Sequence, residues 1–249
     1  MLEGKVALIT GAGQGVGQGI ALALADRGAR VSVAGRTLAK CEKTVEMISD
    51  RGGQAIAVEC NVKSLPSLEA AVKKTVEDFE TIDILVNNAQ EVPLGPIREL
   101  SDEAFGAGWE SGPLATLRLM KLCRPYLVGG GSIVNLASTA SKRWDAAGYS
   151  GYAAVKEAIR ALTRGAASEW AADGIRSNVI LPHAKSPGLE YWIENNPEES
   201  AAFIASIPMR RVGECEEDIG RFVATLCSDD CAYVNGQSIA VDGGQAYMG

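Results

Sequence analysis

The stretch KVALITGAGQGVGQG, at residues 5–19, decides the fold of this 249-residue chain. Its first part, KVALIT, is a short apolar run and predicts a buried strand. Glycines follow at positions 11, 13, 15, 17 and 19, and a helical pattern begins at Gly15. A turn of this kind lets backbone N–H groups and a helix N-terminus face a pyrophosphate. The same glycines also suit a flexible turn without a ligand, but the strand before them and the helix after them favour phosphate binding.

The alternation of short apolar runs and helical stretches continues along the whole chain. Further strands are predicted in ARVSVAG, AIAVEC, IDILVNN, SIVNLAS, IRSNVIL and QSIAVDGG. Helices are predicted at residues 15–27, 37–51 (capped by Thr37), 65–79, 112–128, 149–172 and 216–226, and residues 186–212 are weakly helical. Strands joined by helices of this length pair in parallel with right-handed crossovers. The sequence therefore predicts one doubly wound α/β domain over residues 1–249, with a seven-stranded parallel sheet and helices on both faces.

The charge of the chain limits its partners. The formal net charge is −7, the isoelectric point is about 4.9, and there are no basic runs. This argues against nucleic acid or an anionic membrane surface as the main partner, so an anionic ligand must be held by a local site. No apolar run reaches membrane-spanning length, and the N-terminus lacks a signal-peptide core. We expect a cytoplasmic protein that binds neither nucleic acid nor membranes.

Cysteine and histidine spacing gives no sign of a metal site. The six cysteines are scattered without a CxxC pair, and His183 is the one histidine. Zinc-site spacing is absent, so we expect no metal. The even cysteine count leaves disulfides open, but a large intracellular core with free thiols is the interpretation we favour.

The spacing Gly11-x-x-x-Gly15-x-Gly17 resembles the TGxxxGxG turn of the short-chain dehydrogenase/reductase family rather than the general GxGxxG fingerprint. Further motifs follow in that family's order: Asn87-Asn88-Ala89 after the fourth strand, Ser138 after the fifth, Tyr152-x-x-x-Lys156, and Val241-Asp242-Gly243-Gly244. The resemblance covers essentially the whole chain. It implies an NAD(P)-dependent oxidoreductase that forms a homotetramer through the helices at 112–128 and 149–172 and the C-terminal strand, with a substrate lid at 186–212.

The resemblance also implies which residues meet the cofactor: Gly11, Gln14, Gly15, Val16, Gly17, Asn61, Val62, Asn88, Ala89, Tyr152, Lys156 and Pro182. Arg36 follows Gly35, which stands where NAD-preferring relatives usually place Asp, and a guanidinium suits a 2′-phosphate. We therefore expect a preference for NADP(H), with NAD(H) possible, because Gln14 stands where NADP-preferring relatives often have a basic residue. The alternatives for Arg36 are a solvated loop charge or stacking on adenine alone. For Asn61, adenine contact and an Asx turn are equally open.

Ser138, Tyr152 and Lys156 are the predicted catalytic residues. Hydride transfer to a carbonyl leaves an alkoxide, so an acid must deliver a proton. Lys156 lies one helical turn from Tyr152, and a cation at that distance is expected to lower the pKa of the phenol. Ser138 would orient the carbonyl, and Lys156 would also bond the nicotinamide ribose, as the resemblance implies. Taken singly, the three residues also fit structural roles: a turn cap, a packing residue and a solvated charge.

Four departures from the family pattern gather near the expected nicotinamide. Gly112 stands where relatives have the asparagine that holds a relay water, and Gln90 replaces the glycine of NNAG. His183 replaces a glycine after Pro182, and Ser186 is the nearest match to a threonine. Gln90 must either avoid positive φ or narrow the pocket. His183 is a candidate substrate contact, though a pocket-wall role is favoured. The departures leave a second class open, a cofactor-binding sensor or scaffold without catalysis.

The predicted lid is rich in apolar side chains. Leu189, Tyr191, Trp192, Ile193 and Phe203, together with Trp144, suggest a hydrophobic ketone or secondary alcohol as substrate. Tyr149 lacks a lysine four residues on, so it is expected to line the substrate pocket, as are His183 and Trp192. Arg210 and Arg211 keep a 3-oxoacyl thioester (acyl carrier protein or CoA) reductase open as the alternative enzyme, although an ordinary lid salt bridge is favoured.

Overall fold

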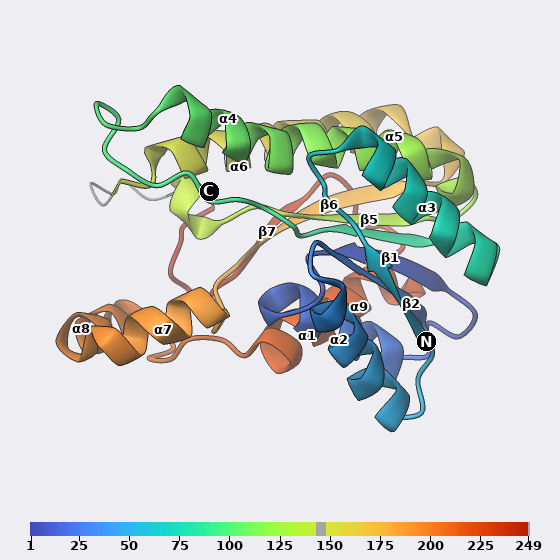
Figure 1. Cartoon of the computed structure of the whole chain (residues 1–249), viewed down its shortest axis with the longest axis horizontal. Coiled ribbons are helices and arrows are strands. Elements are labelled where there is room, and N and C mark those ends of the chain that lie inside the picture. Colours follow the sequence, from blue (N-terminus) through green and yellow to red (C-terminus); the bar gives the residue numbers. More distant parts are fainter. Residues whose placement is uncertain (143–147, 249) are drawn as a thin grey trace.

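Seven parallel strands form one sheet in the computed structural model, which describes residues 1–142 and 148–248 (Figure 1). The strand order is β3-β2-β1-β4-β5-β6-β7. The strands are β1 (Val6–Thr10), β2 (Arg30–Gly35), β3 (Ala55–Glu59), β4 (Ile84–Asn87), β5 (Ser132–Leu136), β6 (Arg176–Pro182) and β7 (Ser238–Val241). The order reverses between β1 and β4, and doubly wound folds bind their ligands at such a switch point. The predicted fold class is confirmed.

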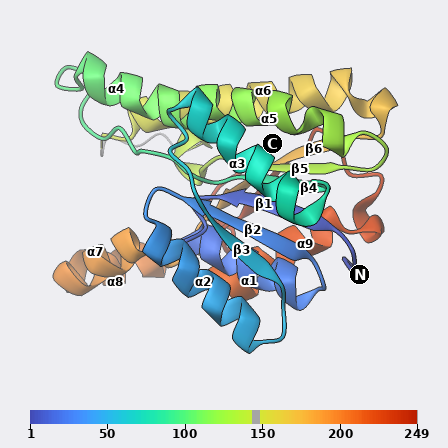
Figure 2. The same cartoon turned by 45° about the vertical axis from the view of Figure 1, so that its right-hand side comes forward.

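Helices cover both faces of the sheet (Figure 2). One layer consists of α1 (Gly15–Asp26), α2 (Leu38–Asp50) and α9 (Arg221–Cys227), and the other of α3 (Leu65–Phe79), α4 (Asp102–Trp109), α5 (Ala115–Leu127) and α6 (Ser150–Glu169). Because successive strand residues point to opposite faces, Ala7 and Ile9 of β1 pack into the core beneath α1, and Leu8 packs into the core beneath α3. All three are fully buried, so β1 contributes to both cores.

Several regions differ from the sequence prediction, and α4 (Asp102–Trp109) is a helix that was not predicted. Residues 186–212, predicted as weakly helical, hold two defined helices, α7 (Pro187–Asn195) and α8 (Pro197–Ser206), which stand out from the body as an arm (Figure 1). Each begins at a proline, whose fixed φ suits a first helical turn. The predicted helix at 112–128 is divided: Glu110–Leu114 is π-helical and α5 follows it. We call Glu110–Leu114 the π turn. A second π-helical segment, Cys215–Gly220, precedes α9.

Smaller expectations can be checked in the same way. Thr37 stands at the N-cap of α2 as predicted, but its hydroxyl makes no capping hydrogen bond. All six cysteines are free thiols, as expected. Short 3-10 turns occupy Thr139–Lys142, Ala171–Asp173 and Asp229–Cys231. Within the described parts of the chain, no helix has the length and apolar character to cross a bilayer.

Candidate active site

The glycine turn after β1 has a backbone that only glycine accommodates easily. Gly11 and Gly15 have φ values of +65° and +58°. At Gly17 a β-carbon would lie 2.4 Å from the carbonyl oxygen of Gly11 and 2.5 Å from Nδ2 of Asn88. Gln14, at the N-cap of α1, makes no capping hydrogen bond with its side chain. The first N–H groups of α1 are therefore available to an anion.

The ends of β1 and β4 are joined at the switch point by Thr10 and Asn88. The Asn88 side chain donates to the backbone oxygens of Thr10 (2.9 Å) and Gly11 (3.1 Å). The Thr10 hydroxyl accepts from the backbone N–H groups of Asn88 (3.1 Å) and Ala89 (3.2 Å). Asn88 thus fixes the glycine turn from the neighbouring strand. The role of Thr10 was not predicted, although its place before Gly11 is a readable signal.

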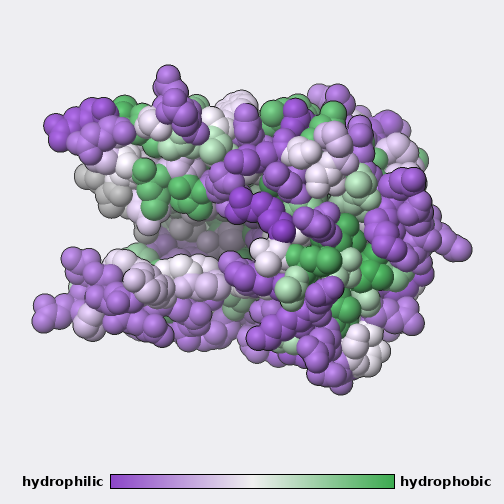
Figure 3. Space-filling model, viewed as in Figure 1, coloured by the Kyte–Doolittle hydropathy of each residue, from purple (hydrophilic) through white to green (hydrophobic). Residues whose placement is uncertain are grey.

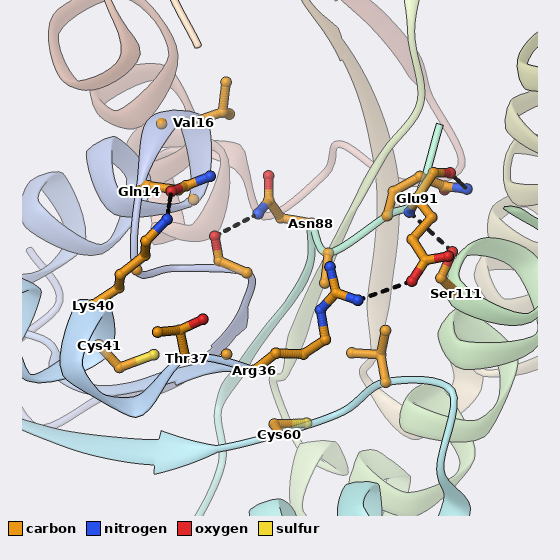
Figure 4. Close-up of a pocket in the computed structure, with 18 of the residues that line it drawn as sticks. Gln14, Val16, Arg36, Thr37, Lys40, Cys41, Cys60, Asn88, Glu91 and Ser111 are labelled. Atoms are coloured by element: carbon orange, nitrogen blue, oxygen red, sulfur yellow. Dashed lines mark hydrogen bonds and ion pairs between the residues drawn. The ribbon is translucent and has the colours of Figure 1, made fainter. Parts of the chain in front are cut away.

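A cavity of about 400 Å³ lies against this turn (Figure 4). It brings together these predicted cofactor residues: Gly11, Gln14, Gly15, Val16, Gly17, Arg36, Asn61, Val62, Asn88 and Ala89. Its wall also includes Lys40, Lys63, Gln90, Glu91, Ser111 and Ser186, none of which was predicted to hold the cofactor. Pro182, Tyr152 and Lys156 are not part of this wall. A glycine-lined anion site beside an open cavity fits the diphosphate and adenosine half of a dinucleotide.

Three cations and one carboxylate surround the cavity. Arg36 Nη1 lies 2.9 Å from Oε1 of Glu91, and Lys63 Nζ lies 3.2 Å from the same oxygen. Across the cavity, Lys40 Nζ donates to Oε1 of Gln14 at 2.6 Å (Figure 4). Lys40 therefore places a cation beside Gln14, the position in the glycine turn where NADP-preferring relatives often have a basic residue. Its position in the first turn of α2, facing that loop, was the signal available.

Asn61 forms an Asx turn at the edge of the cavity. Its Oδ1 accepts from the backbone N–H of Lys63 at 3.2 Å, which confirms the Asx-turn interpretation. The residue also lines the cavity. Adenine contact by Asn61 stays a prediction.

Ser138, Tyr152 and Lys156 come together at the carboxyl end of β5. Ser138 follows β5 by two residues, and the other two lie on the first turns of α6. The hydroxyls of Ser138 and Tyr152 share a hydrogen bond. Lys156 Nζ donates to the Leu136 carbonyl at 2.7 Å and lies 5.4 Å from the centroid of the Tyr152 ring. A buried lysine thus stands beside a phenol that contacts a serine.

The electrostatics of this group differ from the sequence prediction. Burial raises the pKa of Tyr152 to about 12, against a smaller lowering by the hydrogen bond from Ser138. The side chain of Lys156 is 3 % exposed, and burial lowers its pKa to about 7. The prediction that the pKa of Tyr152 is lowered is therefore wrong, because burial of the phenol is the dominant effect. Desolvation disfavours the charged form of both groups, the phenolate of Tyr152 and the ammonium of Lys156.

The predicted substrate residues fall into two sets, one beside Tyr152 and one at the end of β6. The Tyr149 ring lies 6.4 Å from that of Tyr152, centroid to centroid. The His183 ring packs edge-on against Phe203 of α8 at 5.3 Å, and Phe203 packs in the same way against Trp192 of α7 at 5.7 Å. This aromatic row, His183, Phe203 and Trp192, connects the end of β6 to the arm. Trp144 lies outside the described residues.

The arginines of the arm are engaged by the chain itself. Arg211 forms a two-point ion pair with Asp218, with Nη2 at 2.8 Å from Oδ1. Arg210 Nη1 donates to the carbonyl oxygen of Ala205. The salt bridge predicted for this region is confirmed.

Comparison with known proteins agrees with this arrangement. A family model described as enoyl-(acyl carrier protein) reductase matches residues 11–246. A 12α-hydroxysteroid dehydrogenase of Clostridium sp. is 37% identical over 253 residues, which cover 98% of this chain and 97% of that protein.

Two solved structures share the fold over nearly the full length of both chains. A 7α-hydroxysteroid dehydrogenase complexed with NADH and 7-oxo glycochenodeoxycholic acid has a TM-score of 0.93 and 32% identity, covering 99% of this chain and 96% of that one. A protein of Beutenbergia cavernae with NADP bound at low occupancy has a TM-score of 0.90 and 32% identity, covering 98% and 97%.

Fold, glycine turn and relatives together define a nucleotide-dependent oxidoreductase with a Rossmann-type sheet. The chain belongs to the short-chain dehydrogenase/reductase family. It is an NAD(P)-dependent oxidoreductase that acts on CH–OH groups and interconverts ketones and alcohols.

Proposed function

We propose that this protein is an NADP(H)-dependent reductase of hydrophobic ketones, working reversibly on the corresponding secondary alcohols. The observation that carries the proposal is the assembly of Ser138, Tyr152 and Lys156 at the strand ends, in a chain whose glycine turn opens on a cation-lined cavity. The catalytic roles of the three residues are part of the proposal. When bound, the nicotinamide cofactor supplies or accepts the hydride.

The chain's own residues then handle the substrate oxygen and its proton. The Ser138 hydroxyl donates to the carbonyl oxygen and orients it. Tyr152, with a pKa of about 12, is protonated at neutral pH, yet it is far more acidic than an aliphatic alcohol. It therefore gives its proton readily to an alkoxide, which favours its role as the acid in ketone reduction. In the reverse direction the phenol oxygen of Tyr152 must first lose its proton. The nearby Lys156, when it is protonated, stabilises the resulting phenolate.

The preference for NADP(H) rests on the charges around the cavity. Arg36 and Lys40 both line the cavity, in a chain whose overall charge is −7. A 2′-phosphate would take Arg36 from Glu91, since a guanidinium binds phosphate oxygens in a two-point arrangement. Lys63 would keep the Glu91 carboxylate paired. The two similar structures contain different cofactors, NADH in one and NADP in the other, so the proposed preference rests on these side chains.

The hydrophobic substrate is argued from the cleft beside the arm. Figure 3 shows a hollow between the arm of α7 and α8 and the part of the body above it, with hydrophobic residues on the upper wall. Val92, Leu94 and Ile97, between β4 and α4, are exposed, as is Tyr191 of α7. We propose that residues 186–212 form a lid over a hydrophobic ketone, with Tyr149, His183 and Trp192 at its contacts. The bile-acid ligand of the 7α-hydroxysteroid dehydrogenase structure supports steroid-like ketones as first candidates.

A thioester reductase remains the second candidate enzyme because of the description of the matching family model. The arm disfavours it, since Arg211 is already paired with Asp218 and Arg210 bonds a backbone oxygen. A phosphate at either guanidinium would have to share it with these existing contacts.

We also propose that the partner of this chain is a second copy, and that the assembly is a homotetramer. An apolar groove runs along α4, α5 and α6, lined by residues that include Pro113, Leu117, Ala161 and Leu162. Trp109 and Leu117 on this face are 44% and 37% exposed. Light scattering would measure the mass, and a monomer at micromolar concentration would contradict this assembly. A cytoplasmic location stays a prediction.

The function is tested by turnover of a carbonyl panel with NADPH. The panel holds a steroid ketone, a small aromatic ketone and a 3-oxoacyl thioester. We expect turnover of the first two, faster with NADPH than with NADH. Turnover of the thioester alone would favour the second enzyme. Binding of NADPH without turnover of any carbonyl would favour the noncatalytic sensor or scaffold.

A further inference from the structure

Gln90 and Gly112, two of the departures from the family pattern, are in direct contact. A β-carbon at Gly112 would lie 2.4 Å from Oε1 of Gln90 and 2.6 Å from Nε2. The amide of Gln90 therefore covers the α-carbon of Gly112 and fills the space that a side chain there would need. Gln90 is absent from the non-glycine residues with positive φ, so its backbone avoids the strain that a replaced glycine can bring.

The same amide compensates for a missing donor in the π turn. In an i→i+5 helical turn, the N–H of residue 113 would be directed to the carbonyl of Gly108, but Pro113 has no N–H. Nε2 of Gln90 donates to that carbonyl at 2.9 Å, and to its neighbour Glu91 O at 3.1 Å. Oε1 is buried and has no hydrogen-bond partner among the described residues, so Nε2 and packing hold the side chain in place.

A second bond ties the same two segments together. The backbone N–H of Glu91 donates to the Ser111 hydroxyl at 2.9 Å, and that hydroxyl donates to the carbonyl of Ala107 at 2.7 Å. The segment after β4 is thus fastened to the π turn at two adjacent residues. The π turn packs in turn against α6, the helix that carries Tyr152 and Lys156.

We propose that Gln90 and Gly112 compensate for each other. The side chain of Gln90, after β4, fills the space that the asparagine of the family pattern would occupy at position 112. Gln90 is then a positioning residue: it fixes the π turn, and through it the first turns of α6 and the catalytic group. The compensation between Gln90 and Gly112 is inferred from the contacts alone. The effect of Gln90 on catalysis rests on the proposed function.

The test is a double-variant cycle with Gln90→Gly, Gly112→Asn and both together, the pair that restores the residue types of the family. We expect each single change to lower the unfolding temperature, the first by leaving a void and removing one donor to the Gly108 carbonyl, the second by a clash. The double variant should recover most of the loss. Additive losses would overturn the compensation. Gln54→Gly, at an exposed glutamine, is the control, and it should not rescue Gly112→Asn.

Two further readouts test the positioning role. Hydrogen exchange of the amides at residues 150–157 should be faster in Gln90→Gly and return to the parent rate in the double variant. The kcat of Gln90→Gly should fall by on the order of 100-fold, with a much smaller change in KM for NADPH, because a small misplacement of catalytic groups acts on kcat. Gln90→Met keeps the volume but not the donor, and should be intermediate.

The outcomes separate the two proposals. Unchanged exchange in α6 and unchanged kcat in a folded Gln90→Gly would overturn the positioning role. The unfolding temperatures and the exchange rates need no cofactor or substrate. A parent protein that turns over no carbonyl would therefore contradict the proposed function, while the cycle still tests the compensation between Gln90 and Gly112.

Discussion

The glycine turn after β1 and the π turn before α5 both allow a close approach between two segments of the chain, but they do so in different ways. Both bring backbone close to another segment at the site. In the glycine turn, the glycines that allow the close approach belong to one short stretch of sequence, and the atoms around Gly17 leave no room for a β-carbon. In the π turn, Gly112 makes room for a side chain from residue 90, and the fit depends on a partner distant in sequence. Local constraints of the first kind can be read from sequence, whereas reciprocal packing cannot.

The largest effect is expected from a substitution that disrupts the glycine turn. Gly17→Ala places a methyl group against the Gly11 carbonyl and the Asn88 side chain, neither of which can move without losing the bonds that join β1 to β4. We expect a loss of about 3 kcal/mol in the free energy of unfolding, as for an overpacked core, and no measurable NADPH binding. Chemical denaturation and NADPH fluorescence measure the two.

Gly106→Ala is the matched control for that change. Gly106 lies in α4 and a β-carbon there meets no atom within 4 Å. The substitution should stabilise the protein by about 0.5–1 kcal/mol, since alanine loses less backbone entropy in a helix. Equal effects at the two positions would contradict the steric explanation of the turn.

The next effect concerns the cations around the cavity. Arg36→Ala should raise the KM for NADPH by about tenfold to a hundredfold, the value of a hydrogen-bonded charge pair, and should change the KM for NADH little. Lys40→Ala should act in the same direction by a smaller factor. Lys43→Ala, on the same helix but outside the cavity wall, is the control. A preference for NADH in the parent protein would refute the role of Arg36.

The pH dependence of stability sharpens the electrostatic part of the account. The pKa of Lys156 is about 7 in the folded protein and near 10.5 when unfolded. Between these values the unfolded chain binds the extra proton, so the free energy of unfolding rises with pH from about 7 to 10. The parent protein should gain stability relative to Lys156→Met across this interval, measured by urea denaturation at several pH values. A constant difference would mean that the lysine is not desolvated.

The smallest effect is expected at His183. Its ring packs on Phe203 in the aromatic row, which suits a wall of the pocket. His183→Ala should therefore leave the turnover–pH profile nearly unchanged and raise the KM of a bulky ketone modestly. Loss of one limb of the pH profile would instead give His183 a part in proton transfer.

The comparison also explains what the sequence could predict. The strands, the glycine turn and the Tyr152–Lys156 pair were predicted correctly in position because each can be recognised from residues close together in the chain. The contacts of Lys40 with Gln14, Arg36 with Glu91, and Gln90 with Gly112 were missed, since they join segments that only the fold brings together. The pKa of Tyr152 was predicted in the wrong direction because spacing shows the nearby cation but not the burial of both groups.

The most direct test of the central claim is the turnover of Tyr152→Phe with NADPH and a ketone that the parent protein reduces. The change removes only the phenolic hydroxyl. We predict that kcat falls by at least about 1,000-fold, as expected when a general acid is lost, while NADPH fluorescence shows unchanged cofactor binding. Turnover close to that of the parent would contradict the assignment of Tyr152 as the proton donor.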